Sequence, residues 1–170
     1  MKKYVKYAVT AIVAVVFAFI TVPAVTLCIM FPNKYAGELC AAAEEFNLDR
    51  ALVKSVVWAE SKFDKNATSN KGAKGLMQMM PQTFDMCLDA LGMDKQKADI
   101  YDVTSSLRCG CYYLSLLIDK FDGNVTAALM AYNAGEANAQ KFLNGVKVFP
   151  ETQKYLKNIS KARRVYGLFD

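Results

Sequence analysis

The chain has 170 residues, and 21 basic against 16 acidic side chains give it a formal net charge of +5. It contains no histidine, which excludes Ser-His and Cys-His nucleophilic catalysis as well as zinc sites built on histidine. The basic side chains form no continuous run and the aromatic ones fall at helical core spacings, so we expect no nucleic-acid partner.

Residues 1–34 carry the pattern of a membrane segment. Three lysines within the first six residues precede an uncharged run from residue 7 to residue 33, which exceeds the roughly 20 residues that cross a bilayer as a helix. The positive flank predicts a single-pass anchor with the remaining chain outside the cytoplasm. The alternative is a signal peptide cleaved at residues 22–24, which would make the protein secreted. A lipid anchor on Cys28 fits less well, because the large Leu27 precedes it.

Residues 35–170 have the length of one domain, and their hydrophobic residues recur at helical spacing. Asp49 and Asn124 fit helix N-caps, Pro81 and Pro150 fit first turns, and Gly135 fits a helix end. These signals predict helices over residues 35–46, 49–62, 81–91, about 102–122, 124–135 and from 150 onward. Only residues 67–79 have a composition that could supply a small β element. We therefore expect one mainly α-helical domain behind one membrane segment.

A carboxylate lies where the second of these helices calls for a hydrophobic residue. Leu52, Val53, Val56 and Val57 recur on one helix face, and Glu60 falls on the same face. An apolar environment favours the neutral form of a glutamate, which can then donate a proton near neutral pH. The alternative from periodicity alone is a glutamate at a frayed helix end that reaches solvent.

Residues 69–83 combine two glycines with an apolar run that carries an amide. Gly72 and Gly75 permit tight turns and a close approach of the backbone to a ligand. Gln78 offers a donor and an acceptor for a substrate amide, and the methionines beside it offer an adaptable apolar surface. The alternative for the methionine run is core packing at the entry to a helix, with Pro81 in its first turn.

Two later segments place polar groups near helix ends. Tyr132 lies on an apolar helix face just before Gly135, so its hydroxyl comes close to a helix end where a groove can open. Glu151 and Tyr155 are four residues apart and therefore share a helix face. Taken alone, Tyr132 is typical of a core residue, and Glu151 is typical of a solvated helix start.

Taken together, these segments resemble the soluble lytic transglycosylase (SLT) catalytic domain, the goose-type-lysozyme-like family that cleaves the glycan strands of peptidoglycan. The resemblance covers about residues 35–167. Its four motifs follow one another in the family's order: Glu60-Ser61, residues 69–78, residues 131–135 and residues 151–155. Glu136 follows the third motif where the family commonly has a proline, and the connection to Glu151 is short. These two departures concern the shape of one end of the groove.

The resemblance implies an α-rich lysozyme-like fold and a role for each matched residue. Glu60 would be the catalytic acid and base. The side chains that would line the sugar-binding groove are Ser69, Gln78, Met80, Tyr132, Asn133, Glu151 and Tyr155.

The chemistry implied by the resemblance is a cleavage of the MurNAc-GlcNAc β-1,4 bond that consumes no water. Glu60 would protonate the glycosidic oxygen and then accept a proton from the C6 hydroxyl of the sugar, which closes a 1,6-anhydro-MurNAc ring. One alternative is a hydrolytic lysozyme (muramidase) in which Glu151 or Asp64 positions water. The other is a non-catalytic peptidoglycan-binding component of an envelope assembly, against which the acid at Glu60 counts.

The cysteines indicate no cofactor or metal. Cys109 and Cys111 are two residues apart on an expected helix and face different directions, so they form no ligand pair. Together with Cys40 and Cys87 they could form disulfides outside the cytoplasm, in a connectivity that the sequence leaves open. The expected partners are peptidoglycan strands and, through the N-terminal helix, the membrane. The sequence does not identify protein partners.

Overall fold

The computed structural model describes residue 26, residues 29–147 and residues 149–168. Most of the predicted membrane segment, the alternative signal-peptide cleavage site and Cys28 lie outside the described residues. Among the residues described, none of the helices is long and apolar enough to cross a bilayer. The chain divides into two units, Met1–Asn33 and Lys34–Asp170, and every helix considered below belongs to the second.

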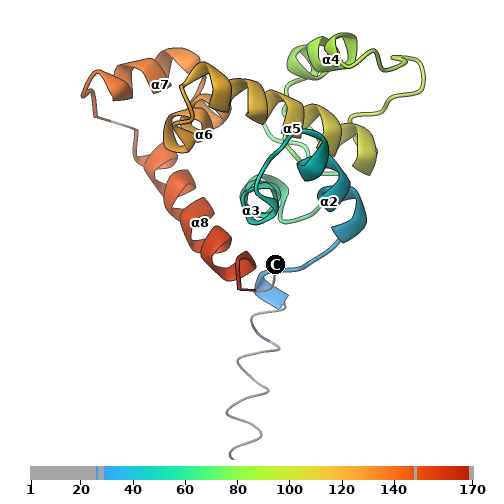
Figure 1. Ribbon diagram of the computed structural model, residues 1–170, viewed down its shortest axis with the longest axis horizontal. Helices are drawn as coiled ribbons and strands as arrows, with labels where there is room; N and C mark the ends of the chain where they lie inside the picture. The colour runs from blue at the N-terminus through green and yellow to red at the C-terminus, as the bar shows by residue number, and fades with distance from the viewer. Residues whose placement is uncertain (1–25, 27–28, 148, 169–170) are drawn as a thin grey trace, which may run out of the picture. The chain divides into compact units, whose positions relative to one another are not determined.

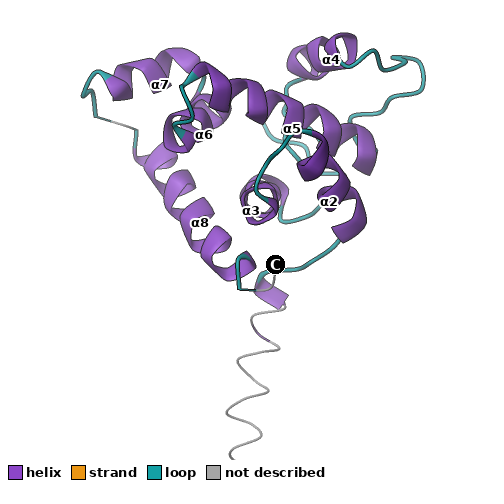
Figure 2. Ribbon diagram, in the orientation of Figure 1, coloured by secondary structure: helices purple, strands orange, loops and turns teal. Residues whose placement is uncertain are grey.

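The described part of the second unit is built from helices joined by loops (Figure 1), without any strand (Figure 2). The prediction of a mainly α-helical domain is therefore confirmed. The helices are α2 (Ala36–Glu45), α3 (Arg50–Ser61), α4 (Pro81–Ala90), α5 (Val103–Lys120), α6 (Val125–Ala134), α7 (Glu136–Leu143) and α8 (Pro150–Tyr166).

The predicted start signals lie where the helices begin. The side chains of Asp49, Asp102 and Asn124 each accept a hydrogen bond from the backbone N–H three residues further on. These bonds satisfy amides that the first turn of a helix leaves without a partner. Pro81 and Pro150 occupy the first turns of α4 and α8, where the missing N–H of proline costs nothing.

Helix α3 is buried over most of its length. Figure 1 views it nearly end on, and it packs most extensively against α8 and also against α2. Lys54, Ser55 and Ser61 lie off the apolar face of α3, and all three are nevertheless buried. The two serine hydroxyls donate to carbonyls of the preceding helical turn, at 2.6 and 3.2 Å. Such bonds make a short polar side chain acceptable inside a protein.

The segment that could have supplied a β element forms only isolated bridges in the described structure. Lys74 bridges to Thr68 on one side and to Met79 on the other. Its backbone exchanges two hydrogen bonds with Met79, of 2.9 and 3.0 Å. Residues 68–79 therefore form a compact loop before α4, which the bridges at Thr68, Lys74 and Met79 hold in shape. We refer to it as the pinned loop.

Helix α7 was not predicted from the sequence. It packs against α6, from which it is separated only by Gly135, with φ of 86°. Ala139 is its only fully buried residue, and Phe142 is partly buried against the same core cluster. A stripe of so few apolar residues in eight positions is too short to mark a helix in the sequence. Much of the connection between the third and fourth motifs is therefore helical.

Candidate active site

Glu60 lines a groove with a volume of about 590 Å³. The groove is formed by the end of α3, the loop before α4, the end of α6 and the start of α8. Six of the seven predicted sugar-binding residues line the same groove: Ser69, Gln78, Met80, Tyr132, Asn133 and Glu151. The seventh, Tyr155, is buried and contacts Glu60 instead. The fold thus brings together residues from four segments that are distant in the sequence.

The surroundings of Glu60 keep its proton near neutral pH. Burial raises the pKa of this carboxyl from the ordinary 4.5 to about 7, while the hydrogen bond from Tyr155 and the charge of Lys62 oppose the rise. Lys62 itself is held over the ring of Trp58, with its Nζ 3.1 Å from the ring centroid. A carboxyl with a pKa near 7 can donate a proton and later take one back at the same pH.

The raised pKa of Glu60 makes the stability of the domain depend on pH. Below pH 4.5 Glu60 carries its proton in both the folded and the unfolded chain. Between pH 4.5 and 7 the unfolded chain releases this proton while the folded chain retains it, and above pH 7 the folded chain must ionise the Glu60 carboxyl in its apolar surroundings. We expect the free energy of unfolding to fall by on the order of 3 kcal/mol over this interval. The Glu60→Gln variant lacks this loss, so urea unfolding of both proteins at pH 5 and pH 8 should diverge. Parallel pH dependences would contradict the raised pKa.

Tyr155 orients Glu60 from behind. Its hydroxyl donates a hydrogen bond of 2.7 Å to Glu60 Oε1, and burial raises the pKa of Tyr155 well above its usual range. A tyrosine that stays protonated can act as a donor throughout the working pH range. The predicted contact of Tyr155 with sugar stays a prediction, and in the structure the hydroxyl is engaged with the Glu60 carboxyl.

Removing this hydroxyl should change the pH dependence of catalysis. The bond from Tyr155 favours the charged form of Glu60, so in Tyr155→Phe the pKa of Glu60 should rise further, by up to about one unit. We expect the limb of the pH-rate profile that reports Glu60 to move to higher pH and turnover to fall. Tyr132→Phe is the matched control, because it deletes a groove hydroxyl that bonds elsewhere. An unchanged profile in Tyr155→Phe would contradict the role of the bond.

Gln78 is held in a strained conformation by its own side chain. Its backbone φ is 47°, a value that residues other than glycine rarely adopt. The side-chain Nε2 donates to the carbonyls of Ala67 and Gly75 at 3.1 and 3.0 Å. Both amide protons therefore fix the loop, which narrows the predicted donor-and-acceptor role: the side-chain oxygen is the group that Gln78 can offer to a ligand N–H.

Tyr132 connects α6 to the same loop. Its hydroxyl donates to the carbonyl of Met77 at 2.9 Å, and its ring packs against Tyr113 with centroids 5.5 Å apart. Tyr132 thus serves both as a core residue and as part of the groove wall. The loop is held by its own Gln78 side chain and by the Tyr132 hydroxyl of α6, so its shape is set before a ligand arrives.

The two candidates for a second acid occupy different places. Glu151 lines the groove from the exposed start of α8. Asp64 is exposed and accepts the backbone N–H of Asn66 at 2.9 Å, and it is not among the residues that line the groove. A second carboxylate acting with Glu60 would therefore have to be Glu151.

Several groove residues were not singled out from the sequence. Asn138 and Phe149 belong to α7 and to the loop after it, a region without any matching motif. Lys71 and Asn70 lie inside the second motif but at positions to which no role was given. Thr152 is buried at the start of α8 and reaches the groove beside Glu151.

The cysteines of the described residues are not joined in disulfides. Cys40 is partly exposed, whereas Cys87, Cys109 and Cys111 are buried. Burial raises the pKa of the Cys87 thiol to about 11, which keeps it protonated and unreactive at neutral pH. Among the residues described, no group of cysteine and acidic side chains is arranged to hold a metal ion.

The profile of the Transglycosylase SLT domain family matches residues 39–154. The chain belongs to this family. The matched SLT region includes Glu60, the pinned loop and the end of α6, and it ends inside the fourth motif. The family resemblance predicted from those motifs is thereby confirmed.

Two relatives show how far the similarity of the SLT domain extends. The chain is 37% identical over 120 residues to the transglycosylase of Enterobacteria phage PRD1, which covers 71% of this chain and 41% of that protein. It is 25% identical over 146 residues to a putative soluble lytic murein transglycosylase of Haemophilus influenzae, covering 78% of this chain and 25% of that protein. The chain therefore spans less than half of the length of either relative.

Solved structures share the fold of the SLT domain. An inactive mutant of the lytic transglycosylase Slt from Pseudomonas aeruginosa superposes with a TM-score of 0.77 at 28% identity, covering 84% of this chain and 25% of that chain. The soluble lytic transglycosylase SLT70 from Escherichia coli superposes equally well, at 23% identity. The α-rich fold expected from the resemblance is therefore the fold observed.

Proposed function

We propose that the domain is a peptidoglycan lytic transglycosylase, which cleaves the MurNAc-GlcNAc β-1,4 bond and leaves 1,6-anhydro-MurNAc ends. The observation that carries the proposal is Glu60, partly buried in a groove lined by the family's motifs and with a pKa raised to about 7. The names of the relatives, a transglycosylase and a lytic murein transglycosylase, point to the same reaction.

The geometry suits a reaction that uses one carboxyl twice. Protonated Glu60 gives its proton to the glycosidic oxygen, and the resulting carboxylate is stabilised by the bond from Tyr155. The carboxylate then accepts the proton of the C6 hydroxyl as the anhydro ring closes. Because the nucleophile belongs to the sugar, no second carboxylate is needed to activate water.

The remaining groove residues would bind and position the sugar. The Gln78 side-chain oxygen can accept the N–H of an acetamido group, since its own amide protons hold the loop. Asn133 and Met80 are exposed at the groove, where they offer a polar and an apolar surface to a sugar ring. Ser69 turns its backbone through two bonds with Ala73, of 2.8 and 3.0 Å, and thereby shapes the wall that faces the sugar.

The experiment is a digest of purified peptidoglycan read by mass spectrometry. Anhydro ends are the expected product. Reducing ends instead would identify the second candidate, a hydrolytic muramidase, which is favoured by the presence of Glu151 in the same groove. Binding without cleavage would identify a peptidoglycan-binding component and would overturn both enzymatic proposals.

We also propose that residues 1–34 anchor the catalytic domain, residues 35–170, in a bacterial cell membrane with the domain outside the cytoplasm. The support is the uncharged N-terminal run with its positive flank. Relatives from Mannheimia succiniciproducens and Haemophilus influenzae are named membrane-bound lytic murein transglycosylase C. Full-length protein should resist extraction from membranes by salt or high pH. A mature N-terminus near residue 25 would show cleavage instead.

A further inference from the structure

A pocket separate from the catalytic groove lies between α3, α6 and α8. It has a volume of about 380 Å³, and none of the described residues lines both it and the groove. We refer to it as the distal pocket. Its floor is apolar, because Leu52 of α3, Leu129 of α6 and Ile159 of α8 lie there almost fully buried. Any selectivity for a charged ligand must therefore come from the polar side chains at its rim.

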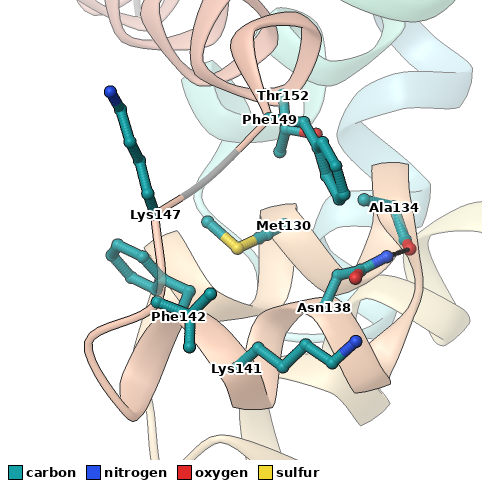
Figure 3. A pocket seen from close by; sticks show the side chains of 9 residues that line it. Met130, Ala134, Asn138, Lys141, Phe142, Lys147, Phe149 and Thr152 are labelled. Atoms are coloured by element: carbon teal, nitrogen blue, oxygen red, sulfur yellow. Dashed lines mark hydrogen bonds between the residues drawn. The ribbon is translucent and has the colours of Figure 1, made fainter.

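The distal pocket and the catalytic groove occupy opposite ends of the same three helices. Helix α3 contributes Leu52, near its start, to the pocket and Glu60, near its end, to the groove. Figure 3 shows the groove end of the other two helices, where Ala134 of α6 and Thr152 of α8 line one cavity. From Thr152 to Arg163, which lines the distal pocket, a helix rises roughly 16 Å. A ligand in the distal pocket therefore lies far from the bond to be cleaved.

The rim of the distal pocket carries two guanidinium groups and two hydroxyls. Arg163 Nε lies 3.4 Å from Asp49 Oδ1, whereas Arg164 is exposed and forms no ion pair with a described residue. Thr126 and Ser160 are exposed beside them. Guanidinium and hydroxyl donors around one cavity suit the oxygens of a phosphate group.

Helix α8 surrounds the distal pocket with positive charge. Residues 152–167 contain five basic and no acidic side chains, which equals the formal net charge of +5 of the whole chain. Lys157, Lys161 and Arg164 are exposed and lie three or four residues apart, so they share one helix face. One sign of charge gathered on one face attracts an extended anionic surface.

A bilayer is the anionic surface that the proposed anchor brings within reach. The uncharged N-terminal run ends at residue 33 and α2 begins at Ala36. Only residues 34 and 35 separate the two, so a domain anchored by this run stays close to the lipid headgroups. A phospholipid also has the chemistry that the distal pocket matches, because it joins a phosphate to apolar chains.

We propose that the distal pocket and the exposed face of α8 dock on a bilayer that contains anionic phospholipids. A headgroup phosphate would lie between Arg164 and Ser160, and the glycerol and first methylene groups of the lipid would meet the apolar floor. Since the catalytic groove lies at the other ends of the same helices, a docked domain would hold it away from the bilayer. The inference uses the proposed anchor and is independent of the proposed reaction.

The test follows the acetylation of lysines by a water-soluble reagent in full-length protein held in nanodiscs. One set of nanodiscs contains phosphatidylcholine alone, and the other contains phosphatidylcholine mixed with phosphatidylglycerol. In the anionic set we expect Lys157 and Lys161 to react about tenfold more slowly, and high salt should restore their rate. Lys71 lines the groove and should react alike in both sets. Equal rates at Lys157 and Lys161 in the two sets would overturn the inference.

Matched variants separate the pocket from a general attraction of charges. Ser160→Asp places an anion in the distal pocket and should abolish the protection of Lys157 and Lys161, whereas Ser160→Asn should keep it. Arg164→Gln should weaken the protection, and Lys65→Gln, which removes one exposed charge from the loop after α3, should not. Thermal melting shows that each variant is folded. Protection that survives both Ser160→Asp and Arg164→Gln would overturn the phosphate site.

The same lipids test the inference if the chain does not enter the nanodiscs, a result that would contradict the proposed anchor. Full-length protein is then sedimented with vesicles of the two compositions. Sedimentation with the anionic vesicles alone, lost in Ser160→Asp, would support docking through the distal pocket. Sedimentation with neither kind of vesicle would overturn it, and a peptidoglycan digest would still test the proposed reaction.

Discussion

Replacing Glu60 by glutamine is expected to slow glycan cleavage on the order of 10² to 10⁴-fold while the fold stays intact. The amide has nearly the shape of the carboxyl and can still accept the hydrogen bond from Tyr155 to Oε1, but it can neither donate nor recover the proton. Clearance of purified cell walls should be followed by turbidity, with thermal melting of the same samples to show that the domain is folded.

Glu151→Gln provides the matched control, because it makes the same chemical change to the other carboxylate of the groove. In a reaction driven by Glu60 alone it should lower the rate only modestly. A loss as large as that of Glu60→Gln would favour the hydrolytic alternative, in which Glu151 positions water. Clearance near the wild-type rate in Glu60→Gln would rule Glu60 out as the acid.

The second large effect is expected from Gly75→Ala, which should lower the free energy of unfolding by more than about 3 kcal/mol. A Cβ at this position would lie 2.2 Å from the backbone oxygen of Ile100, and the φ of Gly75 is +76°. A backbone atom cannot turn aside as a side-chain end can, so one of the two chain segments must move. Urea unfolding measures the loss.

Gly72→Ala separates the clash from the backbone strain. Gly72 has a φ of +88°, and a Cβ there would meet nothing within 4 Å. Its loss should therefore reflect strain alone, about 1 kcal/mol. Equal losses in the two variants would show that the backbone at Ile100 yields to the new methyl group.

Gly75→Ala should also disturb the catalytic groove in any protein that still folds. The N–H of Gly75 donates to the carbonyl of Ala67 at 2.9 Å, and its own carbonyl accepts from Gln78. A displaced Gly75 would shift the side-chain amide of Gln78, which we propose binds the substrate. Cleavage by the folded fraction should accordingly be lower than in Gly72→Ala.

The helices could be predicted where local chemistry marks them. Asp49, Asn124, Pro81 and Pro150 act through neighbours within one turn, so the sequence alone carries the signal. Helix α7 carries no such signal, because its N-cap is Gly135, which directly follows α6 and has no side chain to cap the first turn. The burial of the polar residues of α3 was likewise out of reach, since it depends on α2 and α8 closing around that helix.

The candidate site was predictable as a set of residues but not as a set of contacts. Glu60 stands out by itself, and the motifs name its neighbours. That Tyr155 bonds to Glu60, and that the amide protons of Gln78 hold its own loop, depends on how distant segments meet. Asn138 and Phe149 belong to no motif, so the part of the groove that these two residues line could be found only in the structure.

The bond between Tyr155 and Glu60 joins residues that are 95 positions apart. A ribosome adds on the order of 5 to 20 residues each second, so the acid exists for several seconds before the partner that orients it. The groove wall at Glu151 and Thr152 is made equally late, because it too belongs to α8. A growing chain therefore carries Glu60 without a working site around it. The proposed activity can therefore begin only after α8, the last of the described helices, has been synthesised and has packed against the rest of the domain.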